Sequence, residues 1–348
     1  MNGLGAEPDA RRFDAGGPPL SEVGETEVLR RLVEIARETA GGLELAAGDD
    51  AAIWRAARDQ QLALSQDAIV EGKDFRRDWT TPRQVGRKAM AVALSDLAGM
   101  GARPIWALAT LCAPARTEFD DVLEIQRGLC GLASSVEMAV AGGDVSDIDG
   151  PIVVDVCVAG TLDGENCLRR DRATPGDALV VTGQLGRAAA GLRVLLETNR
   201  VTGFGDAARW VRAQLDPTPR LEEGRTLVAL GVRAGGDISD GLLLEVERLA
   251  RASRCGAEVW LDDVPHDPEL ESSFTETWPE LTLGGGEEFE LLAAVPQRML
   301  DEVLGAWPQH LAPLQSVGVM TENAGVMLRD RRGGAPLEPP AVMSRHYG

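Results

Sequence analysis

The side chains of this sequence best suited to chemistry are acidic residues beside glycines or at the ends of apolar segments. They occur in Gly48-Asp49-Asp50, Ser65-Gln66-Asp67, Ser95-Asp96, Gly143-Asp144, Gly236-Asp237, Ser239-Asp240-Gly241 and Gly285-Gly286-Glu287-Glu288. Exposed runs of charge are usually solvated, but these groups follow or interrupt apolar segments that are expected to be buried. Carboxylate oxygens are hard ligands, which suit Mg²⁺ or Mn²⁺ better than zinc or copper.

Asp96 is the sharpest of these cases, because it lies between Leu94 and Leu97 near the end of an apolar helix. A carboxylate there is partly desolvated and sits at the negative end of the helix dipole, and both effects oppose its charge. A nearby cation would offset both effects. The alternative is that Asp96 faces solvent or pairs with Lys88 or Arg103, since buried charges are often simply paired.

The type of cation follows from the other residues present. The three histidines are His266, His310 and His346, and none lies near the acidic motifs. Magnesium usually takes one or two carboxylates, keeps waters and holds substrate phosphates. A calcium loop is the rival, but residues 147–150 lack the required register and the closing glutamate. The pattern therefore favours magnesium with a phosphorylated substrate.

The charge balance points the same way. The sequence has 35 Lys and Arg against 55 Asp and Glu, a formal net charge of −20. This argues against a general nucleic-acid binder and against docking on an anionic membrane. So acidic a chain holds phosphates only through local cations, backbone amides and selected arginines. Arg169, Arg170 and Arg172 form the densest central basic cluster, unless they pair with local acids such as Asp171 and Asp177. The common P-loop and protein-kinase motifs are absent from the sequence.

The elements that must position these residues mix strands and helices. Apolar periodicity predicts helices over 26–39, 84–98, 119–133, 187–197 and 298–306, and strands over 61–65, 104–112, 137–141, 152–161, 178–183, 258–261 and 289–295. Strands and helices do not alternate strictly, so the expected class is α+β layers instead of a doubly wound sheet. Residues 142–147 nearly repeat as 235–240, agreeing at five of six positions, which reflects either chance or a duplicated architecture.

Length and composition set the domain organisation. A chain of 348 residues suggests two domains. We expect a mobile arm over 1–20, an N-terminal domain over 21–168 and a C-terminal domain over 169–348, with the turn-like stretch 169–177 at the boundary. No secretory signal or membrane-length apolar run is visible, and five scattered cysteines indicate reduced thiols. The expected location is the cytoplasm.

Taken together, these motifs carry a family likeness. The matching segments are GDDAAIW (48–54), LSQDAIVEGKDF (64–75), RKAMAVALSDLAGMGARP (87–104), AGGDVSD (141–147), DRATPGD (171–177), GGDISDGLL (235–243) and GGGEEFELL (284–292). In this order they resemble the thiamine-monophosphate kinases, within the superfamily of aminoimidazole ribonucleotide synthetase. The resemblance implies two α/β domains, with the N-terminal domains of two subunits joined into a β-barrel at a homodimer interface.

The resemblance also implies substrates and site residues. ATP and several Mg²⁺ ions would occupy an acidic cleft, and the γ-phosphoryl group would pass to thiamine monophosphate to give thiamine diphosphate. Metal positions match Asp50, Ser65, Asp67, Asp96, Asp144, Asp237 and Asp240, nucleotide contacts match Gly143, Asp144, Arg170 and Ser239, and Glu287 matches a substrate-contacting acid. Such a transfer needs alignment and neutralised oxygens, which metal ions supply. The acceptor phosphate, with a second pKa of about 6, needs no general base.

Some positions depart from the family pattern. Gln66 replaces a threonine that contacts metal or phosphate, and Asp74 replaces a histidine on the substrate side. Residues 145–147 differ from the usual T-T-R, and residues 344–347 only echo the usual aromatic tail. Metal and nucleotide positions are therefore kept better than acceptor positions. A cyclo-ligase of the same superfamily, and a catalytically weak nucleotide-binding paralogue that acts as a regulator, are the alternatives.

Overall fold

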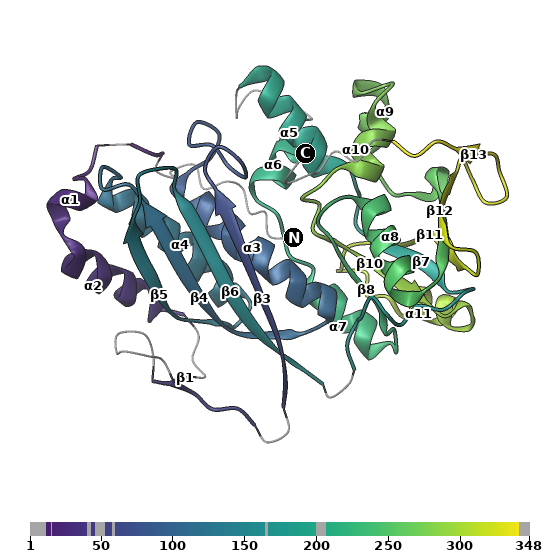
Figure 1. Cartoon of the computed structure of the whole chain (residues 1–348), viewed down its shortest axis with the longest axis horizontal. Coiled ribbons are helices and arrows are strands. Elements are labelled where there is room, and N and C mark those ends of the chain that lie inside the picture. Colours follow the sequence, from purple (N-terminus) through teal and green to yellow (C-terminus); the bar gives the residue numbers. More distant parts are fainter. Residues whose placement is uncertain are drawn as a thin grey trace. The chain divides into compact units, whose positions relative to one another are not determined.

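The computed structural model describes residues 12–14, 16–39, 43–45, 53–57, 60–163, 166–199 and 207–340. The chain forms two compact units (Figure 1). Unit 1 is Met1–Ala93, Pro104–Gly160 and Asn199–Val201, and unit 2 is Leu94–Arg103, Thr161–Thr198 and Thr202–Gly348. Both are mixed layers of sheet and helix, so the predicted α+β class is confirmed. Because unit 2 takes residues from the end of one N-terminal helix, no single cut of the sequence separates the units.

Unit 1 is built on a four-stranded sheet with the order β3-β6-β4-β5 (Figure 1). The strands are β3 (Gln61–Val70), β4 (Arg103–Ala113), β5 (Ala139–Asp147) and β6 (Val153–Leu162). Strands β4 and β5 run parallel, with Ala109 opposite Gly143, and the intervening helix α4 (Phe119–Ser135) makes the crossover that parallel neighbours require. The predicted strand over 61–65 lies within the longer β3, and the one over 137–141 overlaps the start of β5; both strands continue into the acidic motifs.

Helix α3 (Pro82–Met100) and α4 lie against one face of this sheet, and their backbones meet at two glycines (Figure 1). A Cβ atom on Gly86 would lie 1.8 Å from the Ile125 carbonyl oxygen, and one on Gly128 would lie 2.0 Å from that of Arg83. Only glycine permits this approach. Helix α2 (Glu25–Ala36) buries Val28, Leu32 and Ile35 along one stripe, as expected of an amphipathic helix.

The described residues of the N-terminal segment, 12–14 and 16–20, contact the rest of unit 1. Phe13 is buried, and the Gly16 amide donates to the Glu118 carboxylate at 2.8 Å. Pro19 bridges to Glu118, and the short helix α1 (Leu20–Val23) follows. One aromatic side chain and a few hydrogen bonds make these contacts, although the sequence there lacks periodicity. A small antiparallel pair, β1 (Leu43–Leu45) with β2 (Ile53–Trp54), completes unit 1.

Unit 2 has a seven-stranded sheet with the order β13-β12-β9-β11-β7-β10-β8. The strands are β7 (Ala178–Thr182), β8 (Ala234–Ile238), β9 (Gly256–Trp260), β10 (Glu290–Val295), β11 (Leu314–Thr321), β12 (Gly325–Arg329) and β13 (Pro336–Leu337). Only β9 and β12 pair in parallel among the register-assigned pairs of this described sheet. Every residue of β7 and β10 is buried, so both faces of the sheet centre are covered.

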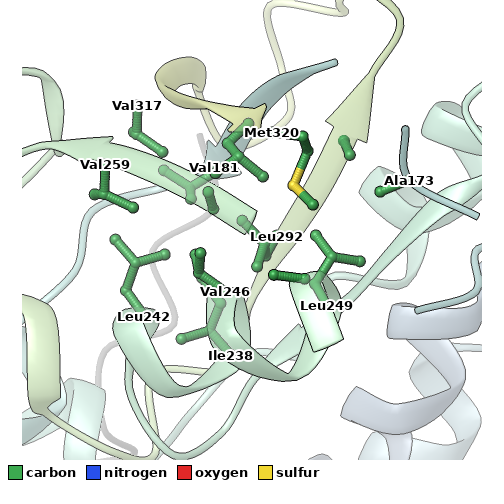
Figure 2. Close-up of a cluster of buried hydrophobic side chains, with 14 of the residues drawn as sticks. Ala173, Val181, Ile238, Leu242, Val246, Leu249, Val259, Leu292, Val317 and Met320 are labelled. Carbon is green, nitrogen blue, oxygen red and sulfur yellow. The ribbon is translucent and has the colours of Figure 1, made fainter. Parts of the chain in front are cut away.

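The helices of unit 2 pack against its sheet, and side chains of both form the hydrophobic core. The helices are α5 (Arg187–Thr198), α6 (Ala208–Leu215), α7 (Leu221–Ala229), α8 (Leu242–Ser253), α9 (Pro268–Ser273), α10 (Trp278–Gly284) and α11 (Leu300–Ala306). Figure 2 shows Leu242, Val246 and Leu249 of α8 pointing into a cluster with Val181 and Leu292 of the sheet. In the part of the chain that the structure describes, no helix is long and apolar enough to cross a membrane.

Candidate active site

Strand β3 carries two of the predicted metal residues, Ser65 and Asp67, on the same face as the buried Ile69. Side chains of a strand alternate between its faces, so Gln66 points the other way. The Gln66 amide donates to the Asp155 carboxylate on β6 at 2.6 Å. The residue that departs from the family pattern therefore lies on the face opposite Ser65 and Asp67.

Strand β5 carries Gly143 and Asp144 beside an open pocket. A Cβ atom on Gly143 would lie 1.8 Å from the Ala109 carbonyl oxygen, so glycine is needed for β4 to approach. Asp144 is exposed and accepts a hydrogen bond from the Ser146 hydroxyl at 3.3 Å. A small open pocket of about 70 Å³, lined mainly by α2, α4, β4 and β5, includes Gly143 and Asp144 in its wall. Its lining is mostly apolar, with Asp144 as the charged side chain beside the glycines.

The sheet does not bring these two groups together within one copy of unit 1. Strands β3 and β5 are its two edges, three strand spacings or roughly 14 Å apart along the sheet. Asp50, also predicted to bind metal, lies outside the described residues, as does the tail over 344–347.

Asp74 has a structural task in the turn after β3. Its carboxylate accepts the Val70 amide at 2.7 Å, and its carbonyl oxygen accepts from the Nζ of Lys88 at 3.0 Å. Lys88 is buried on α3. The buried Lys88 side chain therefore holds the turn that carries Asp74, the predicted substrate residue.

In unit 2, the second Gly-Gly-Asp segment lies on β8 against the end of α3. Asp237 is only 4% exposed, and its carboxylate accepts the Ser95 hydroxyl at 2.8 Å. A Cβ atom on Gly99 would lie 2.7 Å from the Asp237 amide nitrogen. The helix backbone therefore packs directly on the strand, and it brings Ser95 and the neighbouring Asp96 to Asp237.

The pKa of Asp237 reports an acidic environment. Burial, followed by the charge of Asp96, raises the pKa of Asp237 to about 6. The Ser95 hydrogen bond opposes this rise, since a hydrogen bond to the charged form favours ionisation. Asp96 itself is partly buried. The prediction that Asp96 is partly desolvated is therefore confirmed, and the structure adds a second carboxylate close enough to repel it.

Guanidinium groups partner the remaining acids of this region. Arg170 lies across β8, with Nη2 at 3.2 Å from Glu245 and 3.5 Å from Asp237. Arg248 pairs with Asp240 at 2.7 Å and also with Glu245. By contrast, Arg169 forms a two-bond pair with Asp171, so for that residue the local-pairing alternative is right.

Glu287 lies in a strained loop that hydrogen bonds to the end of β8. Glu287 and Phe289 have φ of 62° and 52°, values that ordinary side chains rarely adopt. The Glu287 amide donates to the carbonyl oxygen of Ser239 at 2.7 Å. Two predicted site residues are thus joined through the backbone. The Gln214 side chain on α6 donates to the Glu287 carboxylate.

Glu288 lies in one of the acidic motifs, but the sequence analysis assigns it no role. Its carboxylate accepts the Ala188 amide at 3.1 Å and the Ala189 amide at 3.4 Å, at the N-terminus of α5. Desolvation nevertheless raises the pKa of Glu288 to about 8. Its place beside Glu287 in the same motif was the available signal. Ser95 is also named in a motif, but Gln214, Glu245 and Arg248 carry no sequence signal of their own.

The donor set fits magnesium. Among the described residues, no three His, Cys, Asp or Glu side chains form a ready-made metal cluster. Magnesium does not require one, because it takes one or two carboxylates together with phosphate oxygens and water. The close Asp96 and Asp237 carboxylates supply such a pair, and a cation would relieve the repulsion that raises the pKa of Asp237.

Comparison with known proteins assigns the chain to a protein family. Residues 48–162 match the AIR synthase related protein, N-terminal domain, and residues 174–330 match the AIR synthase related protein, C-terminal domain. These matches define a two-domain protein of the AIR synthase related class. The thiamine-monophosphate kinase of Escherichia coli (strain K12) is 35% identical over 86% of this chain and 91% of that protein. That of Bacillus subtilis (strain 168) is 32% identical over 81% and 86%. The chain belongs to the thiamine-monophosphate kinase family.

Solved structures agree with this placement. Thiamine-monophosphate kinase from Stenotrophomonas maltophilia K279a has a TM-score of 0.77 and 31% identity, covering 87% of this chain and 96% of that one. AaThiL complexed with AMPPCP and TMP has a TM-score of 0.72 and 26% identity, covering 91% and 96%. The hydrogenase maturation protein HypE of E. coli shares the fold at 20% identity and a TM-score of 0.73.

Proposed function

We propose that this protein transfers the γ-phosphoryl group of ATP to the phosphate of thiamine monophosphate, forming thiamine diphosphate. The observation that carries the proposal is the buried Asp237 beside Asp96, two carboxylates that repel each other where a cation would stabilise both. The family relationship supports the choice of substrates, because relatives with this activity in their names are 32–35% identical over most of the chain.

The proposed roles follow the chemistry of each side chain. Bound magnesium would neutralise the phosphate oxygens during in-line transfer. Its proposed ligands are Asp50, Ser65, Asp67, Asp96, Asp144, Asp237 and Asp240. Gly143, Asp144, Arg170 and Ser239 would hold the nucleotide, and the pocket beside β5 offers an apolar space for its base. Asp74 and Glu287 are the proposed acceptor contacts.

We further propose that the N-terminal units of two copies form a β-barrel dimer. Leu62, Leu64 and Leu108 are exposed on the sheet of unit 1, and β3 and β5 end that sheet. Exposed apolar side chains and open sheet edges are features that a partner covers. Light scattering should give a dimer mass for the purified protein and a smaller mass for Leu64→Arg. We place the enzyme in the cytoplasm, where its five free cysteines would stay reduced.

The acceptor screen tests the proposed function. Purified protein, ATP, Mg²⁺ and thiamine monophosphate should yield thiamine diphosphate and ADP in equal amounts. Nucleotide binding without transfer to this acceptor, but with ADP and phosphate released on another phosphorylated substrate, would overturn the proposal in favour of a cyclo-ligase. Tight binding without turnover on any acceptor would instead indicate a regulatory paralogue.

A further inference from the structure

The side-chain amide of Gln214 is buried with only one half satisfied. Gln214 lies on α6 and is 4% exposed. Its Nε2 donates to the Glu287 carboxylate, and its Oε1 has no hydrogen-bond partner among the described residues. Because an ionised carboxylate only accepts, the bond to Glu287 fixes which way the amide faces. The structure thus holds a buried acceptor atom in a fixed orientation.

Further hydrogen bonds tie the chain after α6 to the segment that carries Glu287. Arg220, six residues after Gln214, makes two hydrogen bonds to Glu290 at 2.8 and 2.6 Å. Thr182 donates to the same carboxylate at 2.7 Å. Helix α6 and the chain that follows it therefore bind the 287–290 segment at two points, Gln214 and Arg220. A buried acceptor with no partner is uncommon, because leaving it unpaired costs its full desolvation penalty.

A second buried polar atom without a described partner lies on α10. Thr282 is buried and its hydroxyl has no hydrogen-bond partner among the described residues. That hydroxyl lies 3.0 Å from where a Cβ atom on Gly186 would be, immediately before α5. Glu288 binds the first amides of the same helix. Unit 2 thus holds two buried polar atoms without a described partner, Gln214 Oε1 beside Glu287 and Thr282 Oγ1 beside the start of α5, and a polar ligand could satisfy the first of them.

We infer that Gln214 is a specificity-determining residue whose Oε1 accepts an N–H from the amino group of the acceptor's heterocycle. This inference rests on the proposed function. Apart from its phosphate, thiamine monophosphate has a single kind of hydrogen-bond donor, the exocyclic amine of its aminopyrimidine ring. The thiazolium ring carries no N–H, and the former hydroxyl is esterified. A fixed, buried acceptor next to Glu287 therefore recognises the one donor that identifies this substrate.

The matched probe is oxythiamine monophosphate, in which a carbonyl oxygen replaces that amine. A site that expects a donor rejects an analogue that presents an acceptor, because two acceptors then face each other. We expect wild-type kcat/KM to be about a hundredfold higher for thiamine monophosphate than for the oxo analogue. In Gln214→Met, which keeps the length but lacks the acceptor, the ratio should fall to within about threefold of one.

The ratio of two substrates on one enzyme preparation cancels any loss of folded protein. Gln184→Met is the control, since Gln184 donates to the His266 carbonyl oxygen and should keep the wild-type ratio. If Gln214→Met turns over neither acceptor, equilibrium binding of both compounds gives the same ratio. A wild-type ratio in Gln214→Met, or a wild-type ratio near one, overturns the inference. No turnover of thiamine monophosphate by wild type overturns the proposed function instead.

Discussion

The two Gly-Gly-Asp segments put nearly identical residues into opposite environments. Asp144 on β5 and Asp237 on β8 both lie on an edge strand of their sheets, yet Asp144 is exposed and Asp237 is buried. The difference comes from what packs on each strand. The end of α3 meets β8 through Gly99 and covers Asp237, whereas Gly143 and Asp144 border an open pocket. The motif therefore determines where the carboxylate lies on its strand. Whether a helix packs over that strand determines how much the charged carboxylate is desolvated.

Replacing each aspartate by asparagine should separate catalysis from stability. Both Asp144→Asn and Asp237→Asn should lower kcat by at least about 10³-fold, because each removes a proposed metal ligand. In metal-free buffer at pH 7.5, Asp237→Asn should raise the free energy of unfolding by about 1–3 kcal/mol, since it removes a desolvated charge. Arg170, half exposed, is not left as a buried charge. Asp144→Asn should change stability by less than about 0.5 kcal/mol.

Urea unfolding and steady-state kinetics on the two variants measure both effects. Equal stability changes would contradict the difference in electrostatic cost between the two sites. An active Asp237→Asn variant would remove that residue from the metal site.

The covering of Asp237 can be tested at Gly99. In Gly99→Ala the added methyl would meet the Asp237 backbone at 2.7 Å, and backbone yields little. We expect a loss of about 1–3 kcal/mol in the free energy of unfolding and a kcat reduced more than tenfold. Gly131→Ala on α4 is the matched control, because nothing lies within 4 Å of its added atom. It should stabilise the protein by about 0.5–1 kcal/mol. A Gly99→Ala variant as stable as this control would mean that α3 and β8 are not in direct backbone contact.

The contrast between Asp144 and Asp237 also shows which features of the structure can be predicted from the sequence. Apolar periodicity located α3, α4, α5 and most strands, because each buries one continuous stripe or segment. No element is predicted over 234–253, where β8 and α8 lie: glycines and an aspartate weaken the strand signal of β8, whereas the amphipathic spacing of α8 is a signal that the prediction misses. The motifs identified Asp96 and Asp237, but not that they repel each other. Partners such as Gln214 for Glu287 are 73 positions apart in sequence, and only the tertiary packing joins them.

A desolvated acid in unit 2 should also make stability depend on pH. The pKa of Glu288 is raised to about 8 from an ordinary value near 4.5. The folded state therefore binds this proton more tightly, and stability falls as pH rises from about 4.5 through 8. Glu288→Gln lacks this loss. Its free energy of unfolding, relative to wild type, should increase by on the order of 2–4 kcal/mol between pH 5 and 9.

Urea unfolding across this pH range measures the difference between the two proteins. Glu247→Gln, at an exposed position on α8, should show a constant difference from wild type. A constant difference for Glu288→Gln as well would mean that its carboxylate is solvated in the folded protein.

The smallest expected effect concerns the two faces of β3. Gln66 bonds to Asp155 on the face opposite Ser65 and Asp67, and its side chain is exposed. Gln66→Ala should therefore change kcat by less than about threefold and stability by less than about 1 kcal/mol, the worth of one exposed hydrogen bond. Asp67→Asn, one position away, should lose activity at least a hundredfold. If both variants lost activity equally, the alternation of β3 would not separate the chemistry from the far face, and the threonine-to-glutamine departure would be a change in the site itself.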